Sequence, residues 1–208
     1  MKNMNILDDA GKYLPIMEHF LSIQGEGFHT GLVSYFIRVG GCDVGCHWCD
    51  VKESWNPELH PLLQVDGIIK HIPEHVKTIV LTGGEPLLYN LQHITSELHK
   101  VQKNIHLETS GTGNFSGEID WICLSPKKNE LPKSNMYKKA DELKLIIFNK
   151  TDFEFAEEQA EKVSEDCQLF LQPEWSQREK MTPLIIDYVT QNPKWKISLQ
   201  THKYLQIP

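Results

Sequence analysis

The chain of 208 residues is long enough for one domain with a substantial core, and its 40% hydrophobic and 24% charged residues are typical of a globular protein in water. Its formal net charge of −7, with scattered lysines, argues against a nucleic-acid ligand. No apolar run is long enough to span a membrane, and residues 1–7 lack the basic and apolar segments of a signal peptide. We therefore expect a cytoplasmic protein with no membrane or nucleic-acid partner, folded as a single domain over residues 1–208.

Apolar runs rich in β-branched residues predict strands along most of the chain. They cover residues 34–39, 78–81, 105–109, 121–124, 142–148, 168–171 and 196–199. Between many of them, apolar residues at helical spacing predict helices over residues 65–71, 91–101, 153–163 and 183–189. Strands that alternate with helices predict an α/β fold, in which helical crossovers join the strands of a parallel sheet.

Glycine, cysteine and polar residues follow these predicted strands at the points where the strands end. The segments are Gly40-Gly41-Cys42, Thr82-Gly83-Gly84-Glu85-Pro86, Ser110-Gly111, Ser125-Pro126-Lys127 and Gln172-Pro173-Glu174. In parallel α/β sheets, ligands bind at the carboxyl ends of the strands, in the loops that follow. The sequence therefore predicts a single active-site mouth at one rim of the sheet.

Three of the five cysteines, Cys42, Cys46 and Cys49, lie close together with the spacing C-x3-C-x2-C in a glycine-rich loop. Thiolates at this spacing can converge on one metal centre, and three protein ligands would leave one iron of a 4Fe-4S cluster open. The rival interpretation is a zinc site completed by His47, and the spacing alone does not exclude it. His47 stands between two proposed ligands, which modestly favours iron–sulfur, whereas Cys123 and Cys167 are expected to be small buried hydrophobes.

The cysteine motif, with Trp48 before its last member, resembles the signature of the radical S-adenosylmethionine (SAM) superfamily. Gly83-Gly84-Glu85-Pro86, after the next predicted strand, is similar to the superfamily's second motif, which holds the methionine amino group of SAM. The resemblance implies that the reduced cluster passes one electron to SAM at its open iron. The carbon–sulfur bond of SAM then breaks, which yields methionine and a 5′-deoxyadenosyl radical.

Two further segments narrow the resemblance to the 7-carboxy-7-deazaguanine synthase family. They are residues 20–27, with the sequence FLSIQGEG, and the tail at 200–208, which ends at Pro208. The match runs from about Ile16 to Pro208. It implies a partial, trimmed (β/α) barrel with parallel strands and outer helices, a homodimer, and a tail (about 200–208) that folds into the active site.

The family's reaction converts 6-carboxy-5,6,7,8-tetrahydropterin to 7-carboxy-7-deazaguanine by radical ring contraction with loss of ammonia, in the biosynthesis of queuosine and related 7-deazapurines. The resemblance therefore implies a pterin substrate, a 4Fe-4S cluster, SAM, and a flavodoxin or ferredoxin as electron donor. The cofactor carries the difficult chemistry, so no catalytic side chain is assigned.

Several side chains suit a carboxylated pterin. Gln24 and Glu26 can each make paired hydrogen bonds, although a polar turn is the alternative for either one. Arg38 could clamp a carboxylate, because an arginine without a partner is expensive to bury within an apolar strand. By resemblance, the substrate-binding set is Ile23, Gln24, Gly25, Glu26, Arg38, Thr82, His202 and Pro208, whose terminal carboxylate would contact the substrate.

The SAM-binding set also follows from the resemblance. It comprises Trp48, Cys49, Asp50, Gly83, Gly84, Glu85, Glu108, Ser110, Ser125, Pro126, Lys127, Gln172, Pro173 and Glu174. Hydroxyl and carboxylate groups at strand ends suit a ribose, and Lys127 could meet the methionine carboxylate.

One position departs from the family's pattern. Relatives commonly have Thr or Ser after the Cys-Asp pair, and its hydroxyl binds Mg2+, but here Asp50 is followed by Val51, which has no side-chain oxygen. Magnesium stays an expected cofactor near Asp50 and Val51, held with the help of water and substrate. Two alternative functions remain open: an activating enzyme for glycyl-radical enzymes, and a zinc-stabilised interaction module without catalysis.

Overall fold

The computed structural model describes residues 10–208, which form one curved, nine-stranded sheet in the order β3-β1-β2-β4-β5-β6-β7-β8-β9. The strands are β1 (Tyr13–Ile23), β2 (Val33–Val39), β3 (Leu62–Gln64), β4 (Thr78–Gly83), β5 (Asn104–Thr109), β6 (Trp121–Leu124), β7 (Glu142–Ile147), β8 (Gln168–Pro173) and β9 (Trp195–Ile197). Every neighbouring pair from β2 to β9 is parallel. The predicted α/β fold is thus confirmed, and the sheet is an open, partial barrel because its edges, β3 and β9, are not paired with each other.

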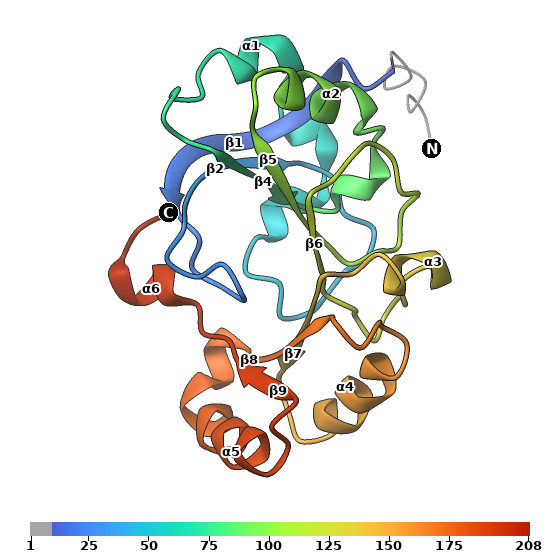
Figure 1. The fold of residues 1–208 in the computed structure, drawn as a ribbon, viewed down its shortest axis with the longest axis vertical. Helices are drawn as coiled ribbons and strands as arrows, with labels where there is room; N and C mark the ends of the chain where they lie inside the picture. The colour runs from blue at the N-terminus through green and yellow to red at the C-terminus, as the bar shows by residue number, and fades with distance from the viewer. Residues whose placement is uncertain (1–9) are drawn as a thin grey trace.

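The helices lie outside the curve of the sheet, as Figure 1 shows. The α-helices are α1 (Val65–Ile69), α2 (Gln92–Lys100), α3 (Ser134–Tyr137), α4 (Asp152–Ala160), α5 (Arg178–Gln191) and α6 (Thr201–Leu205). Short 3-10 turns cover η2 (Lys52–Trp55), η3 (Pro57–Leu59), η4 (Pro86–Leu88) and η5 (Trp175–Gln177). Helix α6 crosses the open side of the sheet between β9 and β1 (Figure 1). Among residues 10–208, no helix is both long and apolar enough to cross a membrane.

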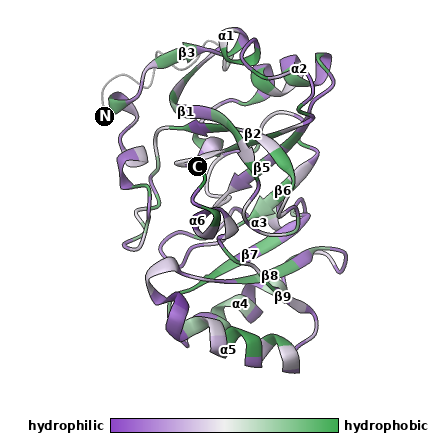
Figure 2. Cartoon of the chain, turned by 90° about the vertical axis from the view of Figure 1, so that its left-hand side faces the viewer, coloured by the Kyte–Doolittle hydropathy of each residue, from purple (hydrophilic) through white to green (hydrophobic). Residues whose placement is uncertain are grey.

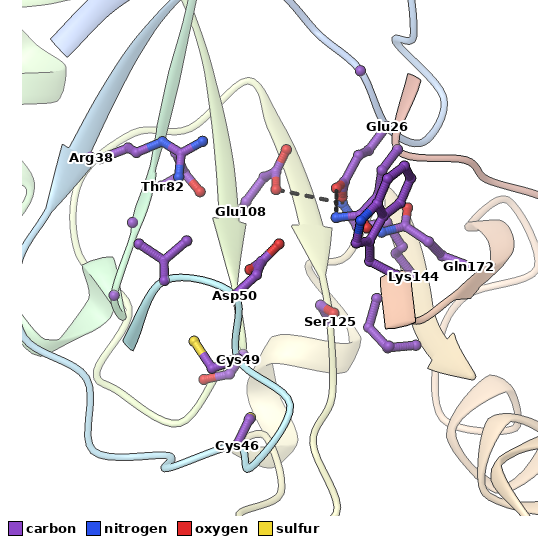
Figure 3. Close-up of a pocket in the computed structure, with 18 of the residues that line it drawn as sticks. Glu26, Arg38, Cys46, Cys49, Asp50, Thr82, Glu108, Ser125, Lys144 and Gln172 are labelled. Atoms are coloured by element: carbon purple, nitrogen blue, oxygen red, sulfur yellow. Dashed lines mark hydrogen bonds and ion pairs between the residues drawn. The ribbon is translucent and has the colours of Figure 1, made fainter. Parts of the chain in front are cut away.

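Alternation along the strands separates an apolar side from a polar one. On β5, Ile105 and Leu107 are fully buried in the hydrophobic core, where Ile94 and Leu98 of α2 also lie. Glu108, between them and the strand end, points instead into the hollow of the sheet (Figure 3). Figure 2 shows the hydrophobic residues running along the central strands. This period of two therefore places the polar side chains of successive strands around one hollow.

The structure differs from the predicted elements in two unpredicted strands, β1 and β3, and in the bounds of α5 and β9. Strand β1 pairs antiparallel with β2 and β3, and neither β1 nor β3 was predicted, so the sheet is mixed instead of wholly parallel. Helix α5 begins five residues before Pro183, which is tolerated because its ring is exposed and only one backbone bond is lost. Strand β9 ends at Ile197, two residues before the predicted end. Residues 110–120 contain no helix and α3 is a single turn, so the two crossovers for which no helix was predicted contain little or no helix.

Candidate functional site

A cavity of about 260 Å3 opens at the carboxyl ends of the parallel strands. Its walls come from β1, β2, β4, β5, β7 and β8, the loops that follow β2 and β6, and the C-terminal tail. Figure 3 shows Arg38 and Thr82 on one side, Glu26 and Lys144 on the other, and Cys46 and Cys49 below. The structure thus gathers segments from Phe20 to Pro208, 188 positions apart in sequence, around one space, as expected for parallel strands whose carboxyl ends meet at one rim.

Nearly all sequence-predicted site residues line this cavity. The three motif cysteines do so, as do Ile23, Gln24, Gly25, Glu26, Arg38, Trp48, Asp50, Val51, Thr82, Gly83, Gly84, Glu85, Glu108, Ser110, Ser125, Lys127, Gln172, Pro173, Glu174, His202 and Pro208. Pro126 is the exception: it is buried behind the wall and lines a neighbouring, smaller cavity. The residues predicted to hold the cluster, SAM and the substrate therefore surround one cavity.

The cysteine loop packs tightly against the strand end that carries Gly83 and Gly84. The Glu85 N–H donates to the Gly41 carbonyl at 2.8 Å, and the Gly84 N–H donates to the Val39 carbonyl at 2.8 Å. A Cβ atom on Gly84 would lie 2.1 Å from the Gly41 oxygen, closer than any side chain allows. Glycine is required here because the two backbones touch, and this contact brings the SAM-type glycine motif beside Cys42.

The three thiols face the cavity and are partly exposed to it. Burial raises the pKa of Cys42 and Cys46, so thiolate formation there needs a bound cation or cluster. Within residues 10–208, no three His, Cys, Asp or Glu side chains converge closely enough for a single metal ion. His47 is exposed and packs edge-on against Phe148, with ring centroids 5.1 Å apart. The exposed position of the His47 ring disfavours a Cys3His zinc site.

Glu85 is a structural brace at the cavity floor, and its side chain is only 1% exposed. Its carboxylate accepts from the Leu87 N–H at 2.9 Å, the Ser110 N–H at 2.7 Å, the Ser110 hydroxyl, and the Thr109 hydroxyl at 2.5 Å. The loop after β4 is thereby tied to the end of β5. Because these bonds occupy the carboxylate, Glu85 meets the cavity mainly through its backbone.

Two further predicted groups are likewise held by internal hydrogen bonds. Lys127 Nζ donates to the Ser125 hydroxyl at 2.6 Å and carbonyl at 2.5 Å, and lies 5.8 Å from the centre of the Trp48 ring. Burial lowers the pKa of Lys127 from its ordinary value. Gln172 Oε1 accepts from the Ser198 hydroxyl at 2.6 Å. These bonds fix the orientation of the wall beside the cysteines.

Arg38 lies at the end of β2, directly beside Thr82 of β4 in the sheet register. Its Nε lies 3.3 Å from Glu18 Oε1, but the alignment is too poor for a hydrogen bond, so this buried atom has no hydrogen-bond partner within residues 10–208. Its guanidinium stacks over Phe20 at 5.6 Å. A fixed guanidinium with unused donors is suited to bind a carboxylate in the cavity.

A network of charged and amide groups covers the opposite wall. Gln24 Nε2 donates to Glu108 Oε1 at 2.9 Å, and Lys144 Nζ lies 2.6 Å from Glu26 Oε2 and 3.5 Å from Glu108 Oε2. Sequence reasoning assigned no role to Lys144. The signal was available, since this lysine interrupts the apolar strand Leu143–Ile147 just as Arg38 interrupts β2, and charged residues are seldom buried without partners.

The tail from Gln200 to Pro208 closes one side of the cavity. The Thr201 N–H donates to the Gly25 carbonyl at 2.8 Å, and the Pro208 carbonyl accepts from the Ser22 hydroxyl at 2.8 Å. The His202 ring lies so close to Gly25 that a Cβ there would be 2.3 Å from its Nδ1. Burial lowers the pKa of His202, so its imidazole is neutral at physiological pH.

The Asp50–Val51 pair offers little to a metal ion. Asp50 Oδ2 accepts from Lys203 Nζ at 2.6 Å, and the Val51 side chain has no oxygen. Magnesium prefers octahedral oxygen coordination, with one or two carboxylates. The donors present here thus fit a protein-held magnesium ion poorly.

Comparisons with known proteins agree with this geometry. Residues 36–121 match the model of the radical SAM superfamily. The chain is 58% identical over 207 residues to the 7-carboxy-7-deazaguanine synthase of Flavobacterium psychrophilum, covering 100% of this chain and 99% of that relative. It is 44% identical to the synthase of the same name from Synechocystis, with 93% of each chain covered.

A solved structure shares the architecture. The crystal structure of QueE from Escherichia coli superposes with a TM-score of 0.82 at 29% identity, covering 97% of this chain and 100% of that one. The motif match, the full-length identities and the shared fold all lead to the same assignment. The chain belongs to the 7-carboxy-7-deazaguanine synthase family of the radical SAM superfamily.

Proposed function

We propose that this chain converts 6-carboxy-5,6,7,8-tetrahydropterin to 7-carboxy-7-deazaguanine with loss of ammonia, as a radical SAM lyase in queuosine and 7-deazapurine biosynthesis. One observation carries the proposal: the cluster cysteines, the glycine motif and a carboxylate-and-arginine wall all face the same cavity. A source of radicals and a polar, bicyclic substrate would therefore meet there. The sequence relatives bear the matching name.

On the cofactor side, Cys42, Cys46 and Cys49 would hold the 4Fe-4S cluster. When bound, the cluster and SAM supply reductive cleavage of SAM, the source of a hydrogen-abstracting radical. Gly83 and Gly84 let the end of β4 pack directly against the end of β2 and the cysteine loop, because a Cβ at either position would meet backbone atoms of Val39 or Gly41, and this places the motif that suits the methionine part of SAM beside Cys42. The Lys127 ammonium suits the methionine carboxylate.

On the substrate side, Arg38 would bind the pterin carboxylate through its unused donors. Glu26 accepts hydrogen bonds and therefore suits the N–H groups of the ring. His202 and the carboxylate of Pro208 approach from the tail, which also limits access of water to the reacting atoms. Sequestration of this kind protects a radical from side reactions.

Magnesium receives no step in this proposal, because Val51 lacks an oxygen and Asp50 is paired with Lys203. A flavodoxin or ferredoxin donor, a homodimer and a cytoplasmic location are supported by the family resemblance. The single-domain organisation is supported by the one sheet that spans the described residues.

The deciding experiment supplies anaerobically reconstituted protein with dithionite, SAM and 6-carboxytetrahydropterin, and measures 7-carboxy-7-deazaguanine by mass spectrometry. We expect product together with methionine and 5′-deoxyadenosine, from a brown protein that contains iron and sulfide. Methionine and 5′-deoxyadenosine without the deazaguanine would reject the substrate, and a colourless zinc protein would reject the reaction class.

The alternative of an activating enzyme for glycyl-radical enzymes makes the opposite prediction about the tail. Deletion of residues 206–208 removes Pro208, whose carbonyl binds Ser22. We expect the truncated enzyme to lose at least about 99% of deazaguanine formation, because its substrate site is incomplete. Full activity after truncation would favour a protein substrate.

A further inference from the structure

Ser198 carries a buried hydroxyl group directly behind the wall of the cavity. It follows the last residue of β9, it is 3% exposed, and it is not one of the residues that line the cavity. Its N–H donates to the Leu171 carbonyl at 2.9 Å, which extends the pairing of β9 with β8 by one residue. The sheet therefore fixes the backbone of Ser198, and its side chain acts on a ligand only through its neighbours.

The Ser198 hydroxyl joins two segments that lie far apart in sequence. It accepts from the Gly27 N–H at 2.9 Å and donates to Gln172 Oε1 at 2.6 Å. A backbone N–H can only donate, so Gly27 occupies a lone pair of the hydroxyl and leaves its single hydrogen for another group. Within residues 10–208, Gln172 is the acceptor of that hydrogen. Because a buried hydroxyl without an acceptor is costly, Gln172 turns its carbonyl toward Ser198, and not its NH2 group.

This orientation leaves the amide nitrogen of Gln172 free to donate into the cavity. Gln172 lines the cavity (Figure 3), and no protein group within residues 10–208 accepts from its Nε2. In the sheet, Gln172 lies beside Ile146, two residues nearer to the end of β7 than Lys144. Ile146 also lines the smaller cavity, next to Cys46 and Trp48. The free N–H donors therefore lie on the side of the cavity where the cysteine loop lies.

The turn that contains Gly27 keeps the Ser198 hydroxyl in this direction. The Phe28 N–H donates to Glu142 Oε2 at 3.2 Å, which ties the turn to β7. The Thr201 N–H donates to the Gly25 carbonyl at 2.8 Å, which ties the turn to the segment after β9. The Gly27 N–H thus has a fixed position, and the hydrogen of the Ser198 hydroxyl points away from it, toward Gln172.

We propose that Ser198 is a positioning residue that turns the N–H donors of Gln172 toward SAM. The inference rests on the proposed function, in which Gln172 belongs to the SAM-binding wall. SAM carries hydrogen-bond acceptors in its ribose and its adenine ring, and a buried amide binds them only when its nitrogen faces them. Without the Ser198 hydroxyl, the amide is free to turn over and present its oxygen, and an acceptor that faces an acceptor loses a hydrogen bond.

The test measures the dissociation constant of SAM for the cluster-loaded enzyme by calorimetric titration, anaerobically and without reductant. We expect Ser198→Ala to weaken SAM binding by roughly tenfold, because the direction of the Gln172 amide is no longer fixed. Ser134→Ala, at an exposed position, is the matched control and should leave SAM binding unchanged. Wild-type affinity for SAM in Ser198→Ala overturns the proposal.

A double-mutant cycle separates positioning from a general loss of structure. Gln172→Met removes the amide but keeps the length of the side chain, so it should weaken SAM binding about as much as Ser198→Ala does. If Ser198 acts through Gln172, Ser198→Ala should weaken SAM binding no further in the Gln172→Met background. A second weakening of the same size in that background overturns the proposal, because Ser198 would then act independently of the amide.

Ser198→Cys takes the place of Ser198→Ala if the alanine variant fails to fold or to load its cluster. A thiol has a similar shape but is a weaker donor, so this variant should weaken SAM binding by roughly fivefold. Wild-type affinity in Ser198→Cys would then overturn the proposal. Absence of deazaguanine formation by wild type, with SAM binding and cleavage intact, would instead reject the proposed function and not this role of Ser198.

Discussion

Lys203 of α6 forms an ion pair with Asp50, the residue directly after the last cluster cysteine, with 2.6 Å between Nζ and Oδ2. The same ammonium lies 5.0 Å from the centre of the Trp175 ring, at the end of β8. The tail is thereby joined to the cysteine loop and to the segment that follows β8. The tail, which closes the substrate side of the cavity, is thus tied to the loop that carries the cluster cysteines.

Lys203→Met should weaken this closure without unfolding the protein. Asp50 is more than half exposed, so the ion pair contributes at most about 1 kcal/mol to stability. We expect the KM for the pterin to rise by about three- to tenfold, with a nearly unchanged midpoint of thermal unfolding. Steady-state kinetics and thermal melts check this, with Lys70→Met as an exposed control. An unchanged KM would show that the ion pair does not hold the tail.

Chelation should leave turnover almost unchanged. Val51 has no oxygen and Asp50 is occupied by Lys203, so no protein-held magnesium is expected to be lost. The measurement compares initial rates after EDTA treatment and desalting with rates after Mg2+ is added back. A stimulation of more than about tenfold by Mg2+ would contradict this expectation and would show that substrate and water suffice to bind the ion.

Glu85→Gln should destabilise the protein. The amide nitrogen would face backbone and hydroxyl donors that now point at a carboxylate oxygen, at a site that is only 1% exposed. Loss of such buried bonds costs about 2–4 kcal/mol in the free energy of unfolding. Urea denaturation of the cluster-free protein measures it, with exposed Glu58→Gln as the matched control. Equal stability of both variants would rule out the brace.

Acid should destabilise the fold through His106 before most carboxylates titrate. Burial, together with His29 at 4.4 Å between ring centroids, lowers the pKa of His106 to about 4. Its unfolded pKa is near 6.5, so the unfolded chain takes up the proton first and stability falls from pH 6.5 towards pH 4. Urea midpoints over this range should fall less steeply in His106→Gln. Parallel pH profiles would exclude His106 as the cause.

The parallel core of the sheet and the cysteine loop were predictable from sequence because both depend on local patterns. Runs such as Thr78–Gly83 are apolar on both faces, and the spacing of Cys42, Cys46 and Cys49 is visible directly. Strand β1 was not predictable in this way. It mixes buried Leu14 and Ile16 with polar residues such as His19, so it lacks a clean period of two.

The hydrogen-bond network of the site was even less predictable from sequence. The bond between Gln24 and Glu108 joins residues 84 positions apart, and that between Gln200 and Glu26 joins residues 174 apart. Composition reveals which side chains can pair, but only the registers of β5 with β6 and of β6 with β7 place Glu108 near Lys144. Glu85 similarly looked like a ligand-binding residue of a loop, and its role as a brace follows only from its burial against β5.

The position of Pro208 has a practical consequence for recombinant production. Its carbonyl is held by Ser22 and the residue lines the cavity, so an affinity tag fused after it would extend the chain across the mouth. A C-terminally tagged preparation should then be brown and well folded, yet poor in turnover. Tags belong at the other end of this polypeptide.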